Sequence, residues 1–196
     1  MATLFVDKID PQSGTSLEIG SSGDTISKGS GVVSRLGVFE SQLLHVRDEK
    51  AQDANGGTNS AGVNTRVLNT VVTNEITGAS LSSNQITLPA GTYYIEATLP
   101  AYRVNRNTGY LYNTTDSSIT IQGIPAFGDG TDGLVTTVSP ITGRFTISAQ
   151  KVLTIRHWTL NSISAAGLGI ASAQPGTSNV TGIVSIYTDV KIWRTA

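Results

Sequence analysis

The sequence contains no cysteine, and this absence excludes disulfide bonds and thiolate metal sites. Charged residues are scarce, at 14% of the 196 residues, against roughly 25% in typical soluble domains. Lys and Arg number 13 and Asp and Glu 14, so the formal net charge of −1 provides no bulk attraction to nucleic acid or to an anionic membrane. No run of apolar residues approaches the length of roughly 18 that a transmembrane helix needs, and we expect no membrane insertion.

Motifs for catalysis or metal binding are also missing. The two histidines, His45 and His157, stand in alternating apolar segments, which predicts hydrogen-bonded side chains in or beside a β core. There is no nucleophile elbow, no zinc-protease helix, no phosphate-binding loop and no metal-ligand cluster. We therefore expect no cofactor and no enzymatic activity. The enzymatic alternative is a small polysaccharide depolymerase that uses paired carboxylates.

Glycine is abundant, with 21 residues, and Ser, Thr and Asn occur throughout, a composition that favours strands and tight turns over long helices. Turn signals recur about every ten residues, which is typical of an antiparallel all-β sandwich or jelly roll. Residues 51–64 are polar and predict a long loop. The segments that predict strands are 42–48, 66–76, 84–88, 92–99, 109–113, 118–124, 143–149, 151–158 and 182–194.

The chain divides into two predicted parts. In residues 1–40, short apolar pairs such as Leu4 with Val6 are separated by Gly/Ser turns and cannot build a core alone. We interpret this part as an extended, β-rich attachment or stalk segment that ends in a linker at 27–31, and a flexible tail is the alternative. Residues 41–196 are the predicted jelly-roll head domain.

Two predicted strands carry aromatic residues on the face opposite the core. In 92–99 the apolar face alternates with a face that bears Tyr94 and Glu96. In 182–194 we expect Val184, Ile186, Val190 and Ile192 to share one face, with Tyr187 and Trp193 on the other. Tyr and Trp concentrate at subunit interfaces, so a subunit contact is predicted, with cover by a loop as the alternative. The predicted interface residues are Tyr94, Glu96, Tyr187 and Trp193.

A Gly-rich loop at 127–134 carries Asp129 and Asp132. Carboxylates on such a loop are weak candidates for calcium ligands. An ordinary surface turn explains the same residues, and we expect no metal site there.

Three stretches carry a resemblance to a known family. "RDEKAQDANGGTNSAGVNTRVLNT" (47–70), "LSSNQITLPAGTYYIEATLPAYRVNRNTGYLYNTTD" (81–116) and "IYTDVKIWR" (186–194) resemble bacteriophage structural proteins whose head is similar to the trimeric jelly roll of tumour necrosis factor and of the complement globular head. Gly91, Tyr93 and Ile95 resemble the strand that enters the core of that fold. The opening "LFVDKIDPQSGTSLEIGSSGDTI" is similar to the N-terminal piece of phage tail-fibre and virion appendage proteins.

This resemblance implies a homotrimer with one sheet of each head facing the three-fold axis. It also implies that an exposed patch on the second half of residues 88–113 recognises a host-surface glycan, because aromatic rings stack on sugars and Arg binds carboxylates. Packing between strands or subunits is the alternative for this patch. Its residues are Tyr102, Arg103, Arg106, Tyr110 and Tyr112.

The resemblance places the protein on a virion, at the tail, baseplate, neck or capsid surface, after synthesis in the host cytoplasm. Expected partners are two further copies of the chain, other virion proteins through residues 1–40, and host polysaccharide. The expected function is that of a short trimeric tail fibre or baseplate fibre that binds the host surface. A head, neck or tail decoration protein with a purely structural role is the alternative.

Overall fold

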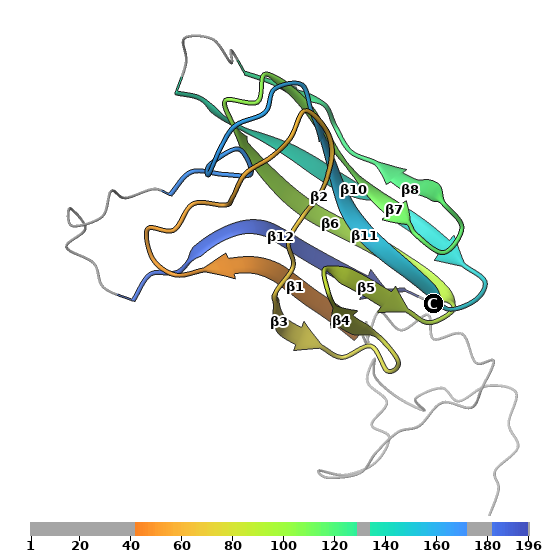
Figure 1. Ribbon diagram of the computed structural model, residues 1–196. Coiled ribbons are helices and arrows are strands. Elements are labelled where there is room, and N and C mark those ends of the chain that lie inside the picture. Colours follow the sequence, from red (N-terminus) through yellow and green to blue (C-terminus); the bar gives the residue numbers. More distant parts are fainter. Residues whose placement is uncertain (1–41, 129–133, 172–181, 196) are drawn as a thin grey trace, which may run out of the picture. The chain divides into compact units, whose positions relative to one another are not determined.

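The computed structural model describes residues 42–128, 134–171 and 182–195, and all regular secondary structure in these ranges is β-strand. The predicted attachment segment, residues 1–40, lies outside the described residues. The strands form two antiparallel sheets that pack face to face (Figure 1). This arrangement confirms the predicted all-β jelly-roll sandwich.

The first sheet has five strands, and its order brings the first and last strands of the head together in its interior. In spatial order these are β10 (Thr136–Ile147), β6 (Gly91–Tyr102), β12 (Ser185–Arg194), β1 (Gln42–Lys50) and β3 (Thr70–Asn74).

The second sheet has seven strands. Its main path follows the order β4 (Ser80–Ser82), β5 (Gln85–Leu88), β11 (Lys151–Thr159), β7 (Arg106–Asn113) and β8 (Ser118–Gln122). Two short strands lie off this path: β2 (Gly62–Thr65) pairs with β11, and β9 (Ala126–Phe127) pairs with β7.

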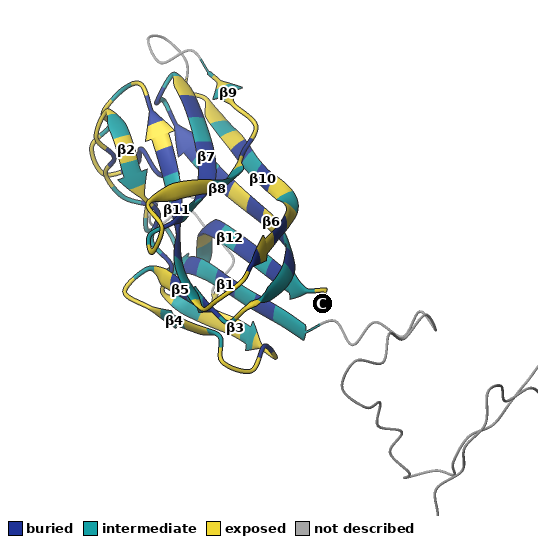
Figure 2. Ribbon diagram, turned by 90° about the vertical axis from the view of Figure 1, so that its right-hand side faces the viewer, coloured by how far each residue is buried: buried dark blue, intermediate teal, exposed yellow. Residues whose placement is uncertain are grey.

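Alternation along the strands determines what each sheet buries, because successive side chains point to opposite faces. In β6 Tyr93, Ile95, Ala97 and Leu99 are buried, as the sequence predicted, and Ala101 and Tyr102 at the end of the strand are buried as well. Tyr93 stacks on Phe145 with ring centroids 5.4 Å apart, and its hydroxyl donates to the Pro89 carbonyl over 2.7 Å. Figure 2 shows the buried residues alternating with exposed ones along the strands of both sheets.

Several strand boundaries differ from those predicted. Residues 66–69 are not part of a strand, although Arg66 and Leu68 are both buried. The predicted loop 51–64 contains most of β2, and β10 begins at Thr136, seven residues before the predicted strand. Between β4 and β5, both turn residues, Ser83 and Asn84, have positive φ, the backbone of a tight two-residue hairpin.

The predicted division of β12 into two faces is wrong at its first half. In the pairing with β1, Arg47 lies opposite Asp189 but Glu49 lies opposite Ile186, so β12 has one extra residue there. This β-bulge interrupts the alternation. As a result Tyr187 is buried and Ile186 is exposed, the reverse of the sequence prediction, whereas Val190 and Ile192 face the core as expected.

Candidate functional site

The outer face of the five-stranded sheet brings together three of the four predicted interface residues. Tyr94 on β6 and Trp193 on β12 are direct cross-strand partners, and their ring centroids are 6.3 Å apart. Glu96 lies two residues along β6 from Tyr94, opposite Lys191, and is exposed. Both rings are half-buried within the single chain, which leaves part of each accessible to a partner.

Tyr187 does not belong to this face. Only 5% of it is exposed, and its hydroxyl donates to the Ala54 carbonyl over 2.6 Å. Its ring lies against Gly169, so loops of the same chain cover it. Burial raises the pKa of this tyrosine above its usual value. The expectation that Tyr187 points outward is therefore wrong, and the β12 bulge is the reason.

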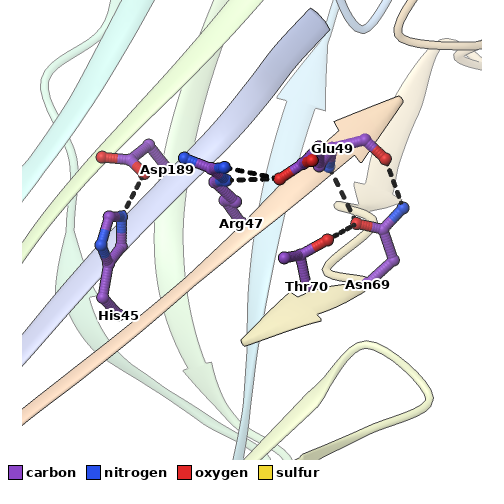
Figure 3. A network of polar contacts seen from close by, with 6 residues as sticks. All are labelled: His45, Arg47, Glu49, Asn69, Thr70 and Asp189. Atoms are coloured by element: carbon purple, nitrogen blue, oxygen red, sulfur yellow. Dashed lines mark hydrogen bonds and ion pairs between the residues drawn. The ribbon is translucent and has the colours of Figure 1, made fainter. Parts of the chain in front are cut away.

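The centre of the same face is ionic. The imidazole of His45 contacts Asp189 through Nε2 (Figure 3). Lys191 lies 3.2 Å from the other carboxylate oxygen of Asp189. Burial by itself would raise the pKa of Asp189, but hydrogen bonds from His45 and Lys191 outweigh it and lower the pKa. Nearby, Arg47 donates to Glu49 from both Nε and Nη2. The outer face thus combines aromatic rings with ion pairs.

Exposed apolar residues lie at the two opposite edges of the five-stranded sheet. The β3 edge carries Val71 and Val72, and the β10 edge carries Val138. Further exposed apolar side chains stand at the beginning of β12 and just before it, at Ile183, Val184 and Ile186.

The outer face of the seven-stranded sheet gathers three of the five predicted glycan residues. In β7 the inward positions include Asn107 and Leu111, so Arg106, Tyr110 and Tyr112 point outward. Arg106 is exposed, as predicted. Tyr112 is half-buried and Tyr110 is buried, because its neighbours cover it.

The other two predicted glycan residues lie elsewhere. Tyr102 is the last residue of β6, in the five-stranded sheet, and it is buried. Arg103 follows in the turn to β7 with a positive φ of 58°, and Asn105 with 65°. This turn carries the chain from one sheet to the other, so the alternation read across residues 101–113 does not continue through it. The expectation of exposed or lightly buried side chains is therefore wrong for Tyr102, as it is for Tyr110.

The structure adds two residues of β11 that the sequence reading did not single out. Arg156 and Trp158 face outward beside β7, since Leu153, Ile155 and His157 face inward. The Arg156 guanidinium lies 3.4 Å from the centroid of the Tyr112 ring, a cation–π contact. Period-two alternation in "KVLTIRHW" already contained this signal.

A shallow hollow lies at one end of this face. Its volume is about 490 Å³. Arg106 is paired with Phe127 of β9, and Trp158 with Thr108, so strands β7, β9 and β11 place these four side chains around it. Residues lining the hollow include Arg106, Thr108, Pro125, Phe127 and Trp158.

A set of polar groups is buried between the sheets below this face. Arg66 donates to Thr188 Oγ1 over 2.7 Å and to the carbonyls of Pro100 and Leu168 over 3.1 and 2.9 Å. Burial lowers the pKa of Arg66 to about 10, although the Asp48 charge acts in the opposite direction. Sequence reasoning did not predict a charged residue there.

His157 is buried in the same interior. Its Nε2 is 2.9 Å from Asn107 Oδ1. Burial first, and then the positive charge of Arg66, lower the pKa of His157 to about 3. His45 and His157 thus confirm the prediction of hydrogen-bonded histidines beside or within the core.

Asp129 and Asp132, the weak calcium candidates, lie outside the described residues. In the described ranges, no group of three or more His, Asp or Glu side chains could hold a metal ion. Nor does any part of the chain that the structure describes form a helix long and apolar enough to cross a membrane.

No protein-family model and no curated protein matches the sequence. Among solved structures, crystalline murine APRIL at pH 5.0 superposes with a TM-score of 0.50 at 9% identity, over 79% of this chain and 99% of the APRIL chain. The globular domain of zebrafish complement 1qA has a TM-score of 0.46 at 14% identity, and the match covers 80% of this chain and 98% of the zebrafish chain. Eiger TNF from S. frugiperda has a TM-score of 0.48 at 10% identity, and the match covers 80% of this chain and 93% of the Eiger chain.

These likenesses concern the fold. The head shares the fold of murine APRIL, a similarity that agrees with the predicted jelly-roll sandwich. The similarity to murine APRIL carries this conclusion, and at 9% identity it extends to the fold alone.

Proposed function

We propose that the protein is the homotrimeric head of a short bacteriophage tail fibre or baseplate fibre, and that it binds a host-surface glycan without catalysing a reaction. In this proposal the outer face of the five-stranded sheet forms the trimer contact. Residues 1–40 attach the head to other virion proteins. The protein is made in the host cytoplasm and works on the virion.

The observation that carries the trimer is the distribution of exposed apolar residues on the five-stranded sheet. Val71 and Val72 stand at the β3 edge and Val138 at the β10 edge, with the Tyr94–Trp193 pair between them. Two different apolar edges fit a head-to-tail contact, in which one edge of each copy meets the other edge of the next. Repetition of such a contact about a rotation axis closes a ring.

Binding without chemistry is supported by the composition of the site. The outer face of the seven-stranded sheet offers aromatic rings and arginines, which suit recognition of a saccharide. Weak binding by one head is sufficient if three heads act together, because linked sites raise avidity by ~10²-fold or more.

The assembly is tested by light scattering on the full chain. We expect a particle of three times 20.5 kDa. A monomer at micromolar concentration would contradict the trimer. Antibody labelling of virions tests the location, and label on the tail or baseplate is expected.

The recognition role is tested separately, by exposing the purified trimer to an array of immobilised saccharides. Saturable binding supports a fibre that recognises the host. A trimer that decorates virions but binds no saccharide would instead indicate the structural decoration role.

A further inference from the structure

The strands of the two sheets differ sharply in charge. The seven strands of the second sheet contain no Asp or Glu, although they contain Arg106, Lys151 and Arg156. Every carboxylate that lies within a described strand belongs to the five-stranded sheet. These are Asp48, Glu49, Glu96 and Asp189. The β7–β11 face therefore presents cations without strand carboxylates to neutralise them.

Two of these three cations have no carboxylate partner. Lys151 forms an ion pair with Asp116 over 2.6 Å at the far end of β11. Arg106 is exposed and, among the described residues, makes no ion pair or side-chain hydrogen bond. Arg156 is half-buried and stacks on Tyr112, and its buried Nε has no hydrogen-bond partner within the described chain. Arginines kept on a surface without an acidic neighbour favour an anionic ligand.

The aromatic rings that accompany these arginines are accessible. Trp158 is 36% exposed and Phe127 is 67% exposed, and both line the hollow that Arg106 also lines. An indole face provides a flat apolar surface, and Arg provides a planar fork of donors. A sugar ring that bears an anionic group combines the two complementary features, a flat apolar face and a charged acceptor.

We infer that the hollow bounded by Arg106, Phe127 and Trp158 binds an acidic saccharide, with the sugar ring on Trp158 and its anionic group on Arg106. Arg156, two residues from Trp158 on the same face of β11, contributes a second positive charge toward the next residue of the saccharide. The inference rests on the proposed glycan recognition and specifies its site and ligand class.

The hollow lies on the sheet opposite to the proposed trimer contact, so three hollows would remain open in one trimer. A second copy of the chain would fill the hollow less well than an acidic saccharide. If its seven-stranded sheet packed there, Arg106 would lose its hydrating water and gain no carboxylate, because the strands of that sheet contain none.

The test uses the full-chain trimer on an array of paired saccharides. One pair is an oligogalacturonate and its methyl ester, and the other is a sulfated carrageenan oligosaccharide and its desulfated form. We expect the trimer to bind a charged saccharide and to bind its neutral partner at least about ten-fold more weakly. The neutral partner cannot accept the charge-assisted hydrogen bond from Arg106, and loss of such a bond has an effect of this size. The two pairs distinguish a carboxylate from a sulfate as the anion.

Variants then locate the site. Arg106→Gln and Trp158→Ala should each weaken binding by about ten-fold or more, and Arg106→Lys should fall between, because it keeps the charge and loses the fork. Lys151→Gln removes a charge from the same sheet outside the hollow, and Ile119→Ala removes an exposed apolar side chain at 53% exposure. Both controls should bind within about two-fold of the parent protein.

The outcomes separate the two levels of the proposal. Acidic binding that survives Arg106→Gln and Trp158→Ala would place the site elsewhere and leave glycan recognition intact. Equal binding to charged and neutral partners would overturn the ligand class. If the trimer bound no saccharide at all, neither these pairs nor any other, the proposed glycan recognition would be wrong, and this inference would fail with it. Light scattering measures the molar mass of each variant, so that weaker binding caused by dissociation of the trimer can be distinguished from loss of the binding site.

Discussion

Arg66 shows how one residue can organise the interior of a sandwich. Its guanidinium joins β12 through Thr188, the end of β6 through Pro100 and the loop before β12 through Leu168. Among the described residues no carboxylate is hydrogen-bonded to it, and one hydroxyl and two carbonyl oxygens accept hydrogen bonds from it instead. A buried charge held in this way stabilises the structure only while all its partners are in place.

We therefore expect Arg66→Met to lower the free energy of unfolding by about 3–5 kcal/mol, because it leaves buried acceptors unpaired. Urea unfolding at one fixed protein concentration measures the change. Arg106→Gln, at an exposed arginine, is the matched control and should change stability by less than about 0.5 kcal/mol. Equal effects of the two variants would show that Arg66 is not part of a buried network.

The lowered pKa of His157 predicts that the free energy of unfolding depends on pH. Its pKa falls from the usual 6.5 to about 3 in the folded protein. Below about pH 6.5 the unfolded chain binds a proton at this residue and the folded protein does not, so stability falls as the pH is lowered toward 3, by on the order of 4 kcal/mol in total. Asp189, with a lowered pKa, adds to the loss at the acid end, and Asp48, with a raised pKa, opposes it.

Urea unfolding at several pH values between 7 and 4 tests this prediction. In His157→Gln the residue no longer titrates, so the slope of stability against pH in this window should become flatter. An unchanged slope would mean that His157 takes up its proton equally in the folded and the unfolded protein.

At the scale of the element, the β-bulge in β12 determines which way Tyr187 points and what packs against it. One extra residue between Asp189 and Ile186 turns Tyr187 inward, where its ring meets the backbone of Gly169. Gly169 has a φ of +137°, and a Cβ built there would lie 2.1 Å from the Tyr187 ring. The bulge, the buried tyrosine and the glycine are therefore one structural unit.

Gly169→Ala should destabilise the head by about 2–5 kcal/mol, the sum of backbone strain and overpacking. Gly57→Ala is the matched control, because Gly57 also has a positive φ of +113° but has open space where its Cβ would lie. It should show the strain alone, about 1–2 kcal/mol. Thermal unfolding of both variants measures the difference, and a Gly169→Ala no worse than Gly57→Ala would contradict the packing.

At the scale of the whole molecule, the two outer faces have different compositions and different proposed roles. The five-stranded sheet combines an aromatic pair, ion pairs and apolar edges, and the seven-stranded sheet combines arginines and aromatic rings without strand carboxylates. Such a division suits a head that meets its own copies on one side and a ligand on the other.

Trp193→Ala should weaken trimer assembly by about ten-fold or more, since it removes a large aromatic anchor from the proposed contact. Arg106→Ala, on the other sheet, should leave assembly unchanged. Sedimentation over a range of protein concentrations compares the two. If Arg106→Ala dissociated the trimer and Trp193→Ala did not, the two faces would have been assigned the wrong way round.

The sequence by itself determined the all-β class, most strand positions and the inner and outer faces of residues 92–99 in β6. This is because alternation is a local property, with a period of two residues in any strand. The sequence also placed Tyr94, Glu96 and Trp193 on one outer face, and Arg106 on another. Only the tertiary structure decided the burial of Tyr102, Tyr187 and Arg66, and the meeting of Arg106 with Phe127 and Trp158. Those outcomes depend on a bulge, on a turn between sheets and on segments that pair across long stretches of chain, and alternation within one strand contains no information about them.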